Sequence, residues 1–354
     1  MRKEERMKEL SRRAFLKNAT IGGAVLAFGN AVFHTPLEAL ADGKHDIGQC
    51  KSIRIKCISE LRYHDRKKHI SAMFAGGGPN TSQYEIPWPS DNGAGNCALI
   101  DMEMSDGRHV KFLLDAGWNR EYMDTCFKRE GVDKMLEKRE IDLLVFSHEH
   151  IDHFAGIESV LKYNPKIKII IPSTFKPQGE RLIKGTQFKV SDIGNTVKHE
   201  GELIKTKPGT VNKLFDGCAA ATFDMNAALG VQGEQSLYFN LKDKGIACVS
   251  GCCHQGILNS AEYVRENIVG GDKIYGIYGG LHIAPVEGRF RLNWEETVKG
   301  MAKYDFKQIA CNHCTGLVAV EKMIEMGFPV VRGTGRFGSL SDLYVGNGDE
   351  VVFG

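Results

Sequence analysis

Short apolar runs alternate with longer amphipathic stretches from Ser52 onward, and this alternation is typical of an α/β protein. The runs IRIKCIS, CALIDMEM, VKFLLDAG, IDLLVF and KIKIIIP predict strands, and a hairpin turn at residues 105–107 joins the second to the third. The stretches REYMDTCFKREGVDKMLEK and AGIESVLKYN each have an apolar face and predict helices, the first despite Gly131.

The second half of the chain repeats this pattern after a weakly periodic middle, residues 173–234, which is rich in Gly, Lys and Thr. SLYFNL and IACVSG predict a strand pair that turns at 243–245, and KIYGIYGG and QIAC predict two more strands. Helices are predicted near 256–268 and over WEETVKGMAKY and LVAVEKMIEM. No linker-like composition separates the halves, so we predict one domain over residues 50–354, built as a four-layer α/β/β/α sandwich.

A long stretch rich in Gly, Pro and Asn, residues 71–96, interrupts the regular pattern and predicts a loop. Loops of this length often have a function, so Tyr84 and Trp88 are candidates for the wall of a substrate cleft. The alternative is a surface excursion without a role in binding.

Residues 1–41 predict an export signal that is not part of the fold. The basic start contains the twin arginines Arg12 and Arg13 within SRRAFLK, a weakly apolar run follows, and the small-residue site ALA stands at 39–41. This pattern resembles a cleaved bacterial twin-arginine signal. The apolar run is too short and glycine-rich for a stable membrane anchor. We therefore expect a periplasmic or otherwise extracytoplasmic protein that contacts the twin-arginine export machinery transiently.

Composition and charge narrow the classes of partner. The 354 residues are 42% hydrophobic and 25% charged, as in globular proteins. Without residues 1–41 the chain has 39 basic and 40 acidic side chains, a net charge of −1, and no basic run. This balance excludes nucleic acid as the main partner and favours a small-molecule substrate, anionic ones included.

The densest chemistry lies in SHEHIDHFAG, directly after the apolar run IDLLVF. Four side chains of metal-ligand type stand there at the spacing H-x-H-x-D-H: His148, His150, Asp152 and His153. On a strand end His148 and His150 point to the same side, so both can bind one metal ion. We expect the turn into the following helix to aim the other two at a second ion, since paired ions activate a shared hydroxide.

FLLDAG, which contains Asp115, and the later SHEHIDH together resemble the metallo-β-lactamase superfamily over most of the chain beyond the signal. VSGCCHQGI, IYGGLHIAP and NHCTG resemble one subgroup of it, the methanopterin-pathway dihydropterin ribofuranosyl-aminobenzene-phosphate synthase-like proteins. The resemblance implies that His254 completes the first metal site and His313 the second. It also implies that Asp115 hydrogen-bonds the ligand loop instead of binding metal.

Two further side chains are candidates at this site. The resemblance makes His282 a further ligand or an acid that polarises the substrate, so Asp152 and His282 are the expected catalytic residues. Where most hydrolases of the superfamily have a metal-bridging aspartate, this chain has Gly251-Cys252. Cys252 is therefore either a thiolate ligand or a buried inert cysteine. The nitrogen-rich ligand set favours Zn²⁺, two ions in number, with Mn²⁺ or Fe²⁺ as alternatives.

These expectations combine into an exported metal-dependent hydrolase in which metal-bound hydroxide attacks an ester, lactone or phosphoester. One alternative is a transferase similar to the subgroup's synthase. The other is a metal-binding protein without catalysis. The ten cysteines leave the redox state open, because CysCys at 252–253 and the pair Cys311 and Cys314 lie beside histidines.

Overall fold

The computed structural model describes residues 27–28, 31–32, 43–188, 193–288 and 291–354. The predicted export signal lies outside them, apart from two short paired strands, β1 (Ala27–Phe28) and β2 (Ala31–Val32). Within the described ranges, no helix combines the length and the apolar composition that crossing a membrane requires.

Two groups of strands face each other across the middle of the molecule. The first has the order β15-β3-β4-β5-β6-β7-β8 and the second the order β14-β13-β12-β11-β10-β9, and one parallel contact between Leu241 and Cys50 joins them. Their bounds are, in chain order, β3 (Cys50–Ser59), β4 (Cys97–Met104), β5 (His109–Leu114), β6 (Leu143–Val145), β7 (Lys168–Pro172), β8 (Leu203–Thr206), β9 (Val211–Phe215), β10 (Cys218–Asn226), β11 (Gln232–Leu241), β12 (Gly245–Ser250), β13 (Ile274–Gly280), β14 (Gln308–Asn312) and β15 (Glu350–Phe353).

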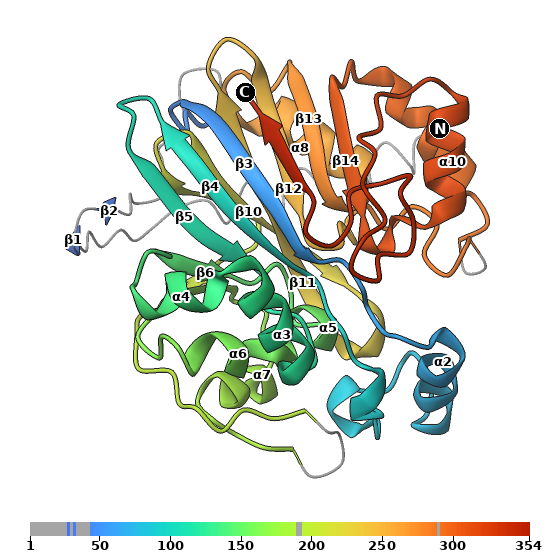
Figure 1. The fold of residues 1–354 in the computed structure, drawn as a ribbon. Helices are drawn as coiled ribbons and strands as arrows, with labels where there is room; N and C mark the ends of the chain where they lie inside the picture. Colours follow the sequence, from blue (N-terminus) through green and yellow to red (C-terminus); the bar gives the residue numbers. More distant parts are fainter. Residues whose placement is uncertain (1–26, 29–30, 33–42, 189–192, 289–290) are drawn as a thin grey trace, which may run out of the picture.

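Helices cover the outer face of each group. In Figure 1 the green helices α3–α7 gather beside the first group, and the orange helices α8 and α10 lie beside the second. The longer helical bounds are α2 (Arg66–Ala75), α3 (Arg120–Glu130), α4 (Val132–Glu137), α5 (Ile151–Phe154), α6 (Glu158–Leu161), α7 (Pro177–Ile183), α8 (Ile257–Asn267), α9 (Trp294–Gly300) and α10 (Leu317–Glu325).

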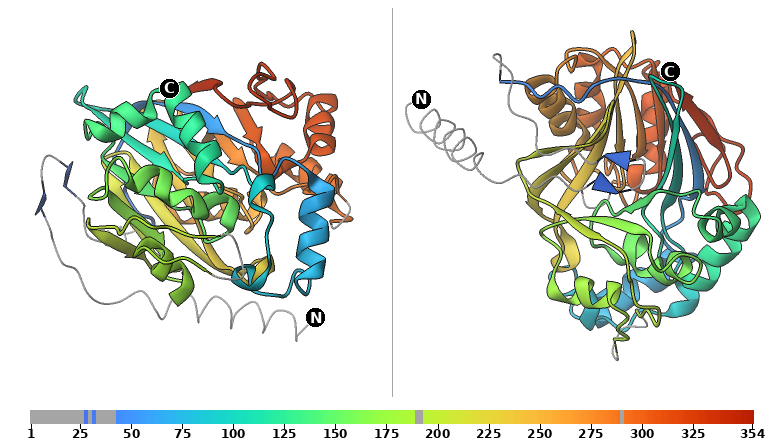
Figure 2. Two further views of the ribbon diagram at one scale, coloured as in Figure 1. Left: turned by 60° about the horizontal axis from the view of Figure 1, so that its bottom comes forward. Right: turned by 90° about the vertical axis from the view of Figure 1, so that its left-hand side faces the viewer.

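Three apolar cores separate the resulting layers. One lies between the two strand groups, where Phe112 of β5 and Phe239 of β11 stack with ring centroids 6.2 Å apart. The other two lie under the helices, around Phe127 of α3 and around Val264 of α8. Figure 2 shows the same layers from two other sides. The predicted four-layer α/β/β/α sandwich is therefore confirmed.

Several predicted elements differ from those observed. Gly131, with a φ of 73°, ends α3 and starts α4, so the expected single helix is two. The expected helix after IDLLVF begins earlier, at Ile151, and is broken into α5, a 3₁₀ turn at Ala155–Ile157 and α6. The weakly periodic middle contains the strands β8, β9 and β10. Both predicted hairpin turns are present, joining β4 to β5 and β11 to β12.

The stretch predicted as a long loop also differs from the expectation. Its first residues belong to α2, which extends to Ala75. Tyr84 and Trp88 are buried instead of lining a cleft, because the Tyr84 hydroxyl donates to Glu149 Oε1 at 2.7 Å and the indole of Trp88 donates to the Gln83 carbonyl. Tyr84 therefore contacts the motif loop directly, while Trp88 contacts Gln83, whose side chain donates to the Glu149 carbonyl.

Candidate metal centre

The predicted site residues come from the carboxyl ends of several strands. β5 and β6 run parallel, as do β12, β13 and β14, so their carboxyl ends meet at one edge of the sandwich. His148 and His150 follow β6, while Asp152 and His153 lie inside α5. The last two were expected in the turn before the helix. Because the helix starts at Ile151, its first turn holds them instead.

The first group of candidate ligands consists of His148, His150 and His254, whose ligand atoms lie within 4.8 Å of one another. Nε2 of His148 is 2.9 Å from Nδ1 of His150. The His254 ring lies 4.7 Å from the first ring and 4.9 Å from the second, measured between centroids. The three imidazoles that the sequence assigned to one metal ion are thus brought together.

Glu234 holds His254 in place and was not singled out in the sequence. Its Oε2 accepts from Nδ1 and from the backbone N–H of His254, both at 2.7 Å, and its Oε1 accepts from the N–H groups of Cys252 and Cys253. Burial alone would raise the pKa of Glu234, but His254 and these hydrogen bonds lower it to about 2. The carboxylate is therefore ionised and fixes the loop after β12.

The second group consists of Asp152, His153 and His313. Nε2 of His153 is 3.0 Å from Nε2 of His313, which in turn is 3.5 Å from Oδ2 of Asp152. Nδ1 of His313 donates to the carbonyl oxygen of Glu60 at 2.7 Å. Residues from α5 and from the end of β14 therefore meet as the second predicted site.

Asp115 orients residues of both ligand groups through hydrogen bonds, as expected from the sequence. Its carboxylate accepts from the Ser147 backbone N–H at 2.7 Å, from the Ser147 hydroxyl at 2.8 Å and from Nδ1 of His153 at 2.6 Å. The Ser147 hydroxyl oxygen is also 2.8 Å from Nδ1 of His148. Asp115 thus orients one histidine of each group without pointing at the cluster itself.

The histidines share one arrangement that fits a metal ion. Each donates an N–H from one ring nitrogen to a protein acceptor, and its other nitrogen faces the cluster. The acceptors are Ser147 Oγ for His148, Ala228 O for His150, Asp115 for His153, Glu234 for His254 and Glu60 O for His313. Lone pairs that face each other about 3 Å apart repel unless a cation lies between them, and metal-binding histidines have this outer hydrogen bond.

The ionisation of these side chains also suits metal binding. Burial, followed by the charges of neighbouring histidines, holds the pKa of His148 well below its usual range and lowers that of His150 to about 3. Burial would lower the pKa of His153 too, but Asp115 and Asp152 raise it to about 9. His148 and His150 are therefore neutral, as ligands must be, whereas His153 keeps a proton at pH 7 that a metal ion would displace.

Cys252 lies between the two groups, at the place where most relatives would have the bridging aspartate. Its Sγ is 3.1 Å from Nε2 of His153, and it lies within ligand distance both of His148 with His153 and of His254 with His282. Burial, and then Cys314, raise the pKa of the Cys252 thiol well above its usual value. All ten cysteines of the chain are unpaired and buried in the structure.

His282 stands at the rim of the first group. Its ring lies 4.5 Å from that of His254, and its Nδ1 is buried without a hydrogen-bond partner among the described residues. Burial, then the charge of His254, lowers the pKa of His282 to about 4. Its Nδ1 thus differs from the outer ring nitrogens of the five histidines above, which donate to protein acceptors, although the ring also contacts Cys314.

Backbone strain concentrates around these groups. Four non-glycine residues at the centre have positive φ angles, although this region costs an L-residue about 1–2 kcal/mol. They are Asp115 (64°), Cys253 (56°), His282 (45°) and His313 (53°). The surrounding hydrogen bonds hold side chains in positions that a relaxed backbone would not give.

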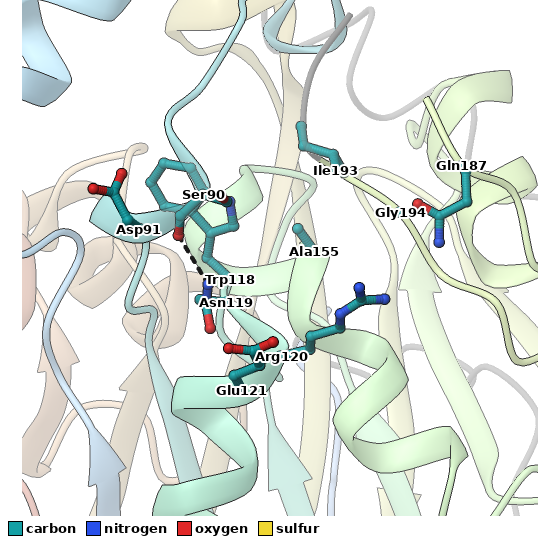
Figure 3. A pocket seen from close by; sticks show the side chains of 10 residues that line it. All are labelled: Ser90, Asp91, Trp118, Asn119, Arg120, Glu121, Ala155, Gln187, Ile193 and Gly194. Carbon is teal, nitrogen blue, oxygen red and sulfur yellow. Dashed lines mark hydrogen bonds between the residues drawn. The ribbon is translucent and has the colours of Figure 1, made fainter. Parts of the chain in front are cut away.

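One hollow in the described structure is separate from this centre. About 280 Å³ in volume, it lies between Ser90 and the start of α3 on one side and Gln187 with Gly194 on the other, and no candidate ligand lines it (Figure 3). A second hollow of about 250 Å³ is lined by Ala227 and other residues beside the carbonyl that accepts from His150.

Comparisons with known proteins agree with this description. Residues 90–218 match the family described as the metallo-beta-lactamase superfamily. Over 267 residues the chain is 26% identical to the 7,8-dihydropterin-6-methyl-4-(beta-D-ribofuranosyl)-aminobenzene-5'-phosphate synthase of Methanocaldococcus jannaschii, covering 68% of this chain and 87% of the synthase. An uncharacterized protein of the same organism is 28% identical over 247 residues, covering 66% of this chain and 88% of its own length.

A solved structure has a similar fold. It is a metal-dependent hydrolase of the beta-lactamase superfamily, with a TM-score of 0.50 and 17% identity. The alignment covers 84% of this chain and 98% of the hydrolase.

Proposed function

We propose that this chain is a metal-dependent hydrolase of small-molecule esters, lactones or phosphoesters, because residues 90–218 match the metallo-beta-lactamase superfamily and the fold is similar to that of a solved hydrolase. The observation that carries the proposal is the set of five histidines that each direct one free ring nitrogen into a shared cluster. Bound Zn²⁺, or Mn²⁺ or Fe²⁺ in its place, would polarise the substrate and lower the pKa of a water nucleophile.

The protein side chains have separate tasks in this reaction. His148, His150 and His254 would hold the first ion, and Asp152, His153 and His313 the second, with Cys252 as a further candidate ligand. His282 has no acceptor for its buried Nδ1 and a neutral ring, so it would donate an N–H to the polarised oxygen of the substrate. Asp152 and His282 are accordingly the proposed catalytic residues.

The test combines metal analysis with a substrate panel. Purified protein is stripped with a chelator, reloaded with Zn²⁺, Mn²⁺ or Fe²⁺, and assayed on p-nitrophenyl phosphate, bis(p-nitrophenyl) phosphate, p-nitrophenyl acetate and a lactone. We expect one to two ions per chain and hydrolysis of at least one substrate. His148→Ala and His150→Ala should each lose the first ion, because two remaining ligands bind it too weakly. His109→Ala, a change at an exposed histidine, is the control. Full metal retention in both site variants would show that the ligands are assigned wrongly.

A synthase is the second candidate, favoured by the 26% identity to the synthase of Methanocaldococcus jannaschii. The two reactions differ in which molecule supplies the atom that forms the new bond. A hydrolase places one solvent oxygen in its product, so the product formed in ¹⁸O-labelled water gains one labelled atom. A synthase joins two substrates and gains none. Bound metal without turnover of any substrate would instead favour a non-catalytic metal-binding protein.

We also propose that the protein acts outside the cytoplasm. The support is the sequence of residues 1–41, with Arg12 and Arg13 ahead of a short apolar run. Replacing both arginines by lysine should leave an unprocessed precursor in the cytoplasm, as measured by fractionation and N-terminal sequencing. Export that is unchanged by this double substitution would contradict the assignment.

A further inference from the structure

Arg62 extends into the metal centre from the end of β3. Its Nε donates to Oδ2 of Asp152 at 2.9 Å, the same oxygen that lies 3.5 Å from Nε2 of His313. A permanent cation therefore stands beside a residue that the second metal ion would use.

The ion pair with Asp152 uses only one of the three guanidinium nitrogens of Arg62. Among the described residues, no hydrogen bond or ion pair of Arg62 other than that of Nε is found, so Nη1 and Nη2 have no acceptor. The side chain is 23% exposed while that of Asp152 is 8% exposed. The outer edge of the fork, with its parallel N–H donors, thus faces solvent next to the ligand groups. A fork of this kind matches a carboxylate or a phosphate oxygen pair.

Two neighbouring arginines each direct a donor to a backbone carbonyl group instead of to a candidate ligand. Arg66 uses its guanidinium on the carbonyl of Val286 at 2.8 Å, and Arg291 uses its own on the carbonyl of His282. Burial, followed by the charge of Arg62, lowers the pKa of His69 to about 4, so its ring is neutral at pH 7. Of these three arginines, Arg62 is the one whose hydrogen bond goes to a candidate metal ligand, Asp152.

We propose that Arg62 binds an anionic group of the substrate, a carboxylate or a phosphoryl group, beside the second metal position. This proposal adds a substrate-binding residue to the proposed hydrolase function. It rests on that function only because it calls the bound anion a substrate. An anion there would complete the fork of Arg62 and offset the positive charge that accumulates when an ion joins Asp152. Neutral esters of the same shape would lack this interaction, so Arg62 would select among substrates.

A binding measurement that needs no turnover tests the proposal. Phenylphosphonate, which is anionic and cannot be hydrolysed, is titrated calorimetrically into metal-loaded wild type, Arg62→Met and Arg62→Lys, with metal content determined for each. We expect Arg62→Met to bind at least about 10-fold more weakly at unchanged metal content, because a charge-assisted pair of hydrogen bonds is lost. Arg62→Lys, with its single point of charge, should retain part of the affinity. Arg54→Met, on the body of β3, makes the same charge change and should leave binding unchanged.

The outcomes separate this proposal from the hydrolase function. Unchanged phenylphosphonate affinity in Arg62→Met, or no binding by the wild type, overturns it. Loss of the second ion in Arg62→Met overturns it too, because Arg62 would then only support Asp152. Binding that depends on Arg62 in a protein that hydrolyses nothing would preserve the anion site while removing the hydrolase function. If turnover is found, the KM of Arg62→Met should rise for p-nitrophenyl succinate and not for the matched neutral p-nitrophenyl butyrate.

Discussion

At the scale of single residues, Glu234 shows what sequence motifs leave out. It lies in β11 between Gly233 and Gln235, twenty positions before its partner His254, and no spacing rule connects the two. Four of the six candidate ligands stand together in SHEHIDH, and the resemblance added His254 and His313; the structure brings these side chains together, and their binding of metal stays a prediction. The residues that orient them act through the fold, and only Asp115, at the end of its strand, could be expected beforehand.

Glu234→Gln is expected to weaken binding of the first ion by about 10–100-fold. The amide still accepts a hydrogen bond from His254, but it lacks the negative charge that favours a cation nearby. Competition with a chromophoric chelator measures the affinity. Glu266→Gln, an exposed carboxylate on α8, should behave as wild type. Equal affinities in Glu234→Gln and wild type would mean that the carboxylate only ties the loop after β12.

Cys252→Ser is expected to lose the second ion at chelator concentrations that the wild type tolerates. The sulfur lies among the ligand atoms of both groups, and a serine hydroxyl is a much poorer ligand than a thiolate. Cys248→Ser supplies the comparison, because Cys248 is also buried, in the core under α8, and belongs to none of the groups of ligand atoms. It should lower stability alone. Identical metal content in both variants would make Cys252 a packing residue.

At the scale of elements, apolar periodicity predicted the strands that pack on apolar layers and failed where buried residues are polar. β8, β10 and β11 meet through Thr206, Thr222 and Gln235, whose side chains hydrogen-bond to one another at 2.8 Å and 3.0 Å inside the structure. Such strands have no clean alternation of apolar and polar residues. The break at Gly131 was missed for another reason: the flanking turns share one apolar face, and only the positive φ separates them.

Gly279 shows how tightly two of the site's strands approach each other. A Cβ at this position, where φ is 115°, would lie 1.9 Å from the carbonyl oxygen of Ser250 in β12. Gly279→Ala is therefore expected to lower the free energy of unfolding. The loss should exceed that of a glycine substitution without this contact by at least about 2 kcal/mol. Gly327→Ala is that control, because its φ is also positive at 77° but no atom lies within 4 Å.

Chemical denaturation monitored by circular dichroism measures both variants. The control isolates the cost of the backbone conformation, about 1–2 kcal/mol, and the difference isolates the contact between β12 and β13. Metal affinity should fall in Gly279→Ala, since Cys252 and His282 follow these strands. Equal stabilities in the two variants would show that β13 moves away without cost.

At the scale of the whole molecule, one buried carboxyl group ties the C-terminal segment to β3. Oε1 of Glu60 accepts from the Leu340 N–H at 3.2 Å and Oε2 accepts from the Tyr344 hydroxyl at 3.4 Å, while its own N–H donates to Asn347. Burial, only partly offset by these hydrogen bonds, raises its pKa from 4.5 to about 7. The folded protein therefore prefers the protonated acid.

This shift predicts a stability that depends on pH. Below pH 4.5 Glu60 is protonated in both states and its contribution is complete. Between 4.5 and about 7 the unfolded chain loses the proton first, so stability falls, and above 7 the loss is constant. A shift of this size corresponds to about 3 kcal/mol. Glu60→Gln cannot ionise and should lack this decline.

Urea denaturation of wild type and Glu60→Gln at pH 5 and pH 8 checks the expectation. Glu325→Gln, on the exposed side of α10, controls for the general loss of a negative charge. Comparing each variant with wild type at the same pH removes the pH dependence of metal binding. If the free energies of unfolding of Glu60→Gln and wild type change equally with pH, the pKa of Glu60 lies near its ordinary value.

The overall architecture was predictable because each half repeats strand and helix patterns with one apolar face. The joining of the halves was not, since the two strand groups meet through one strand pair, Leu241 with Cys50, and through side-chain contacts such as that of Thr206 with Thr222. No local pattern specifies which strands face each other. The sandwich could be predicted from the number of apolar faces that other elements must cover. The candidate metal centre could be predicted from the types of residue in the motifs.

The wide spacing of the ligands along the chain has a consequence for folding. His148 and His150 are neighbours, but His254 and His313 join them only after the second half has assembled, so each site closes long loops. Contacts of such high sequence separation form late and slowly. Binding of an ion at the native affinity therefore requires that both halves of the chain have folded. Release of the ion into a fluorescent chelator would follow global unfolding in real time, without a probe attached to the protein.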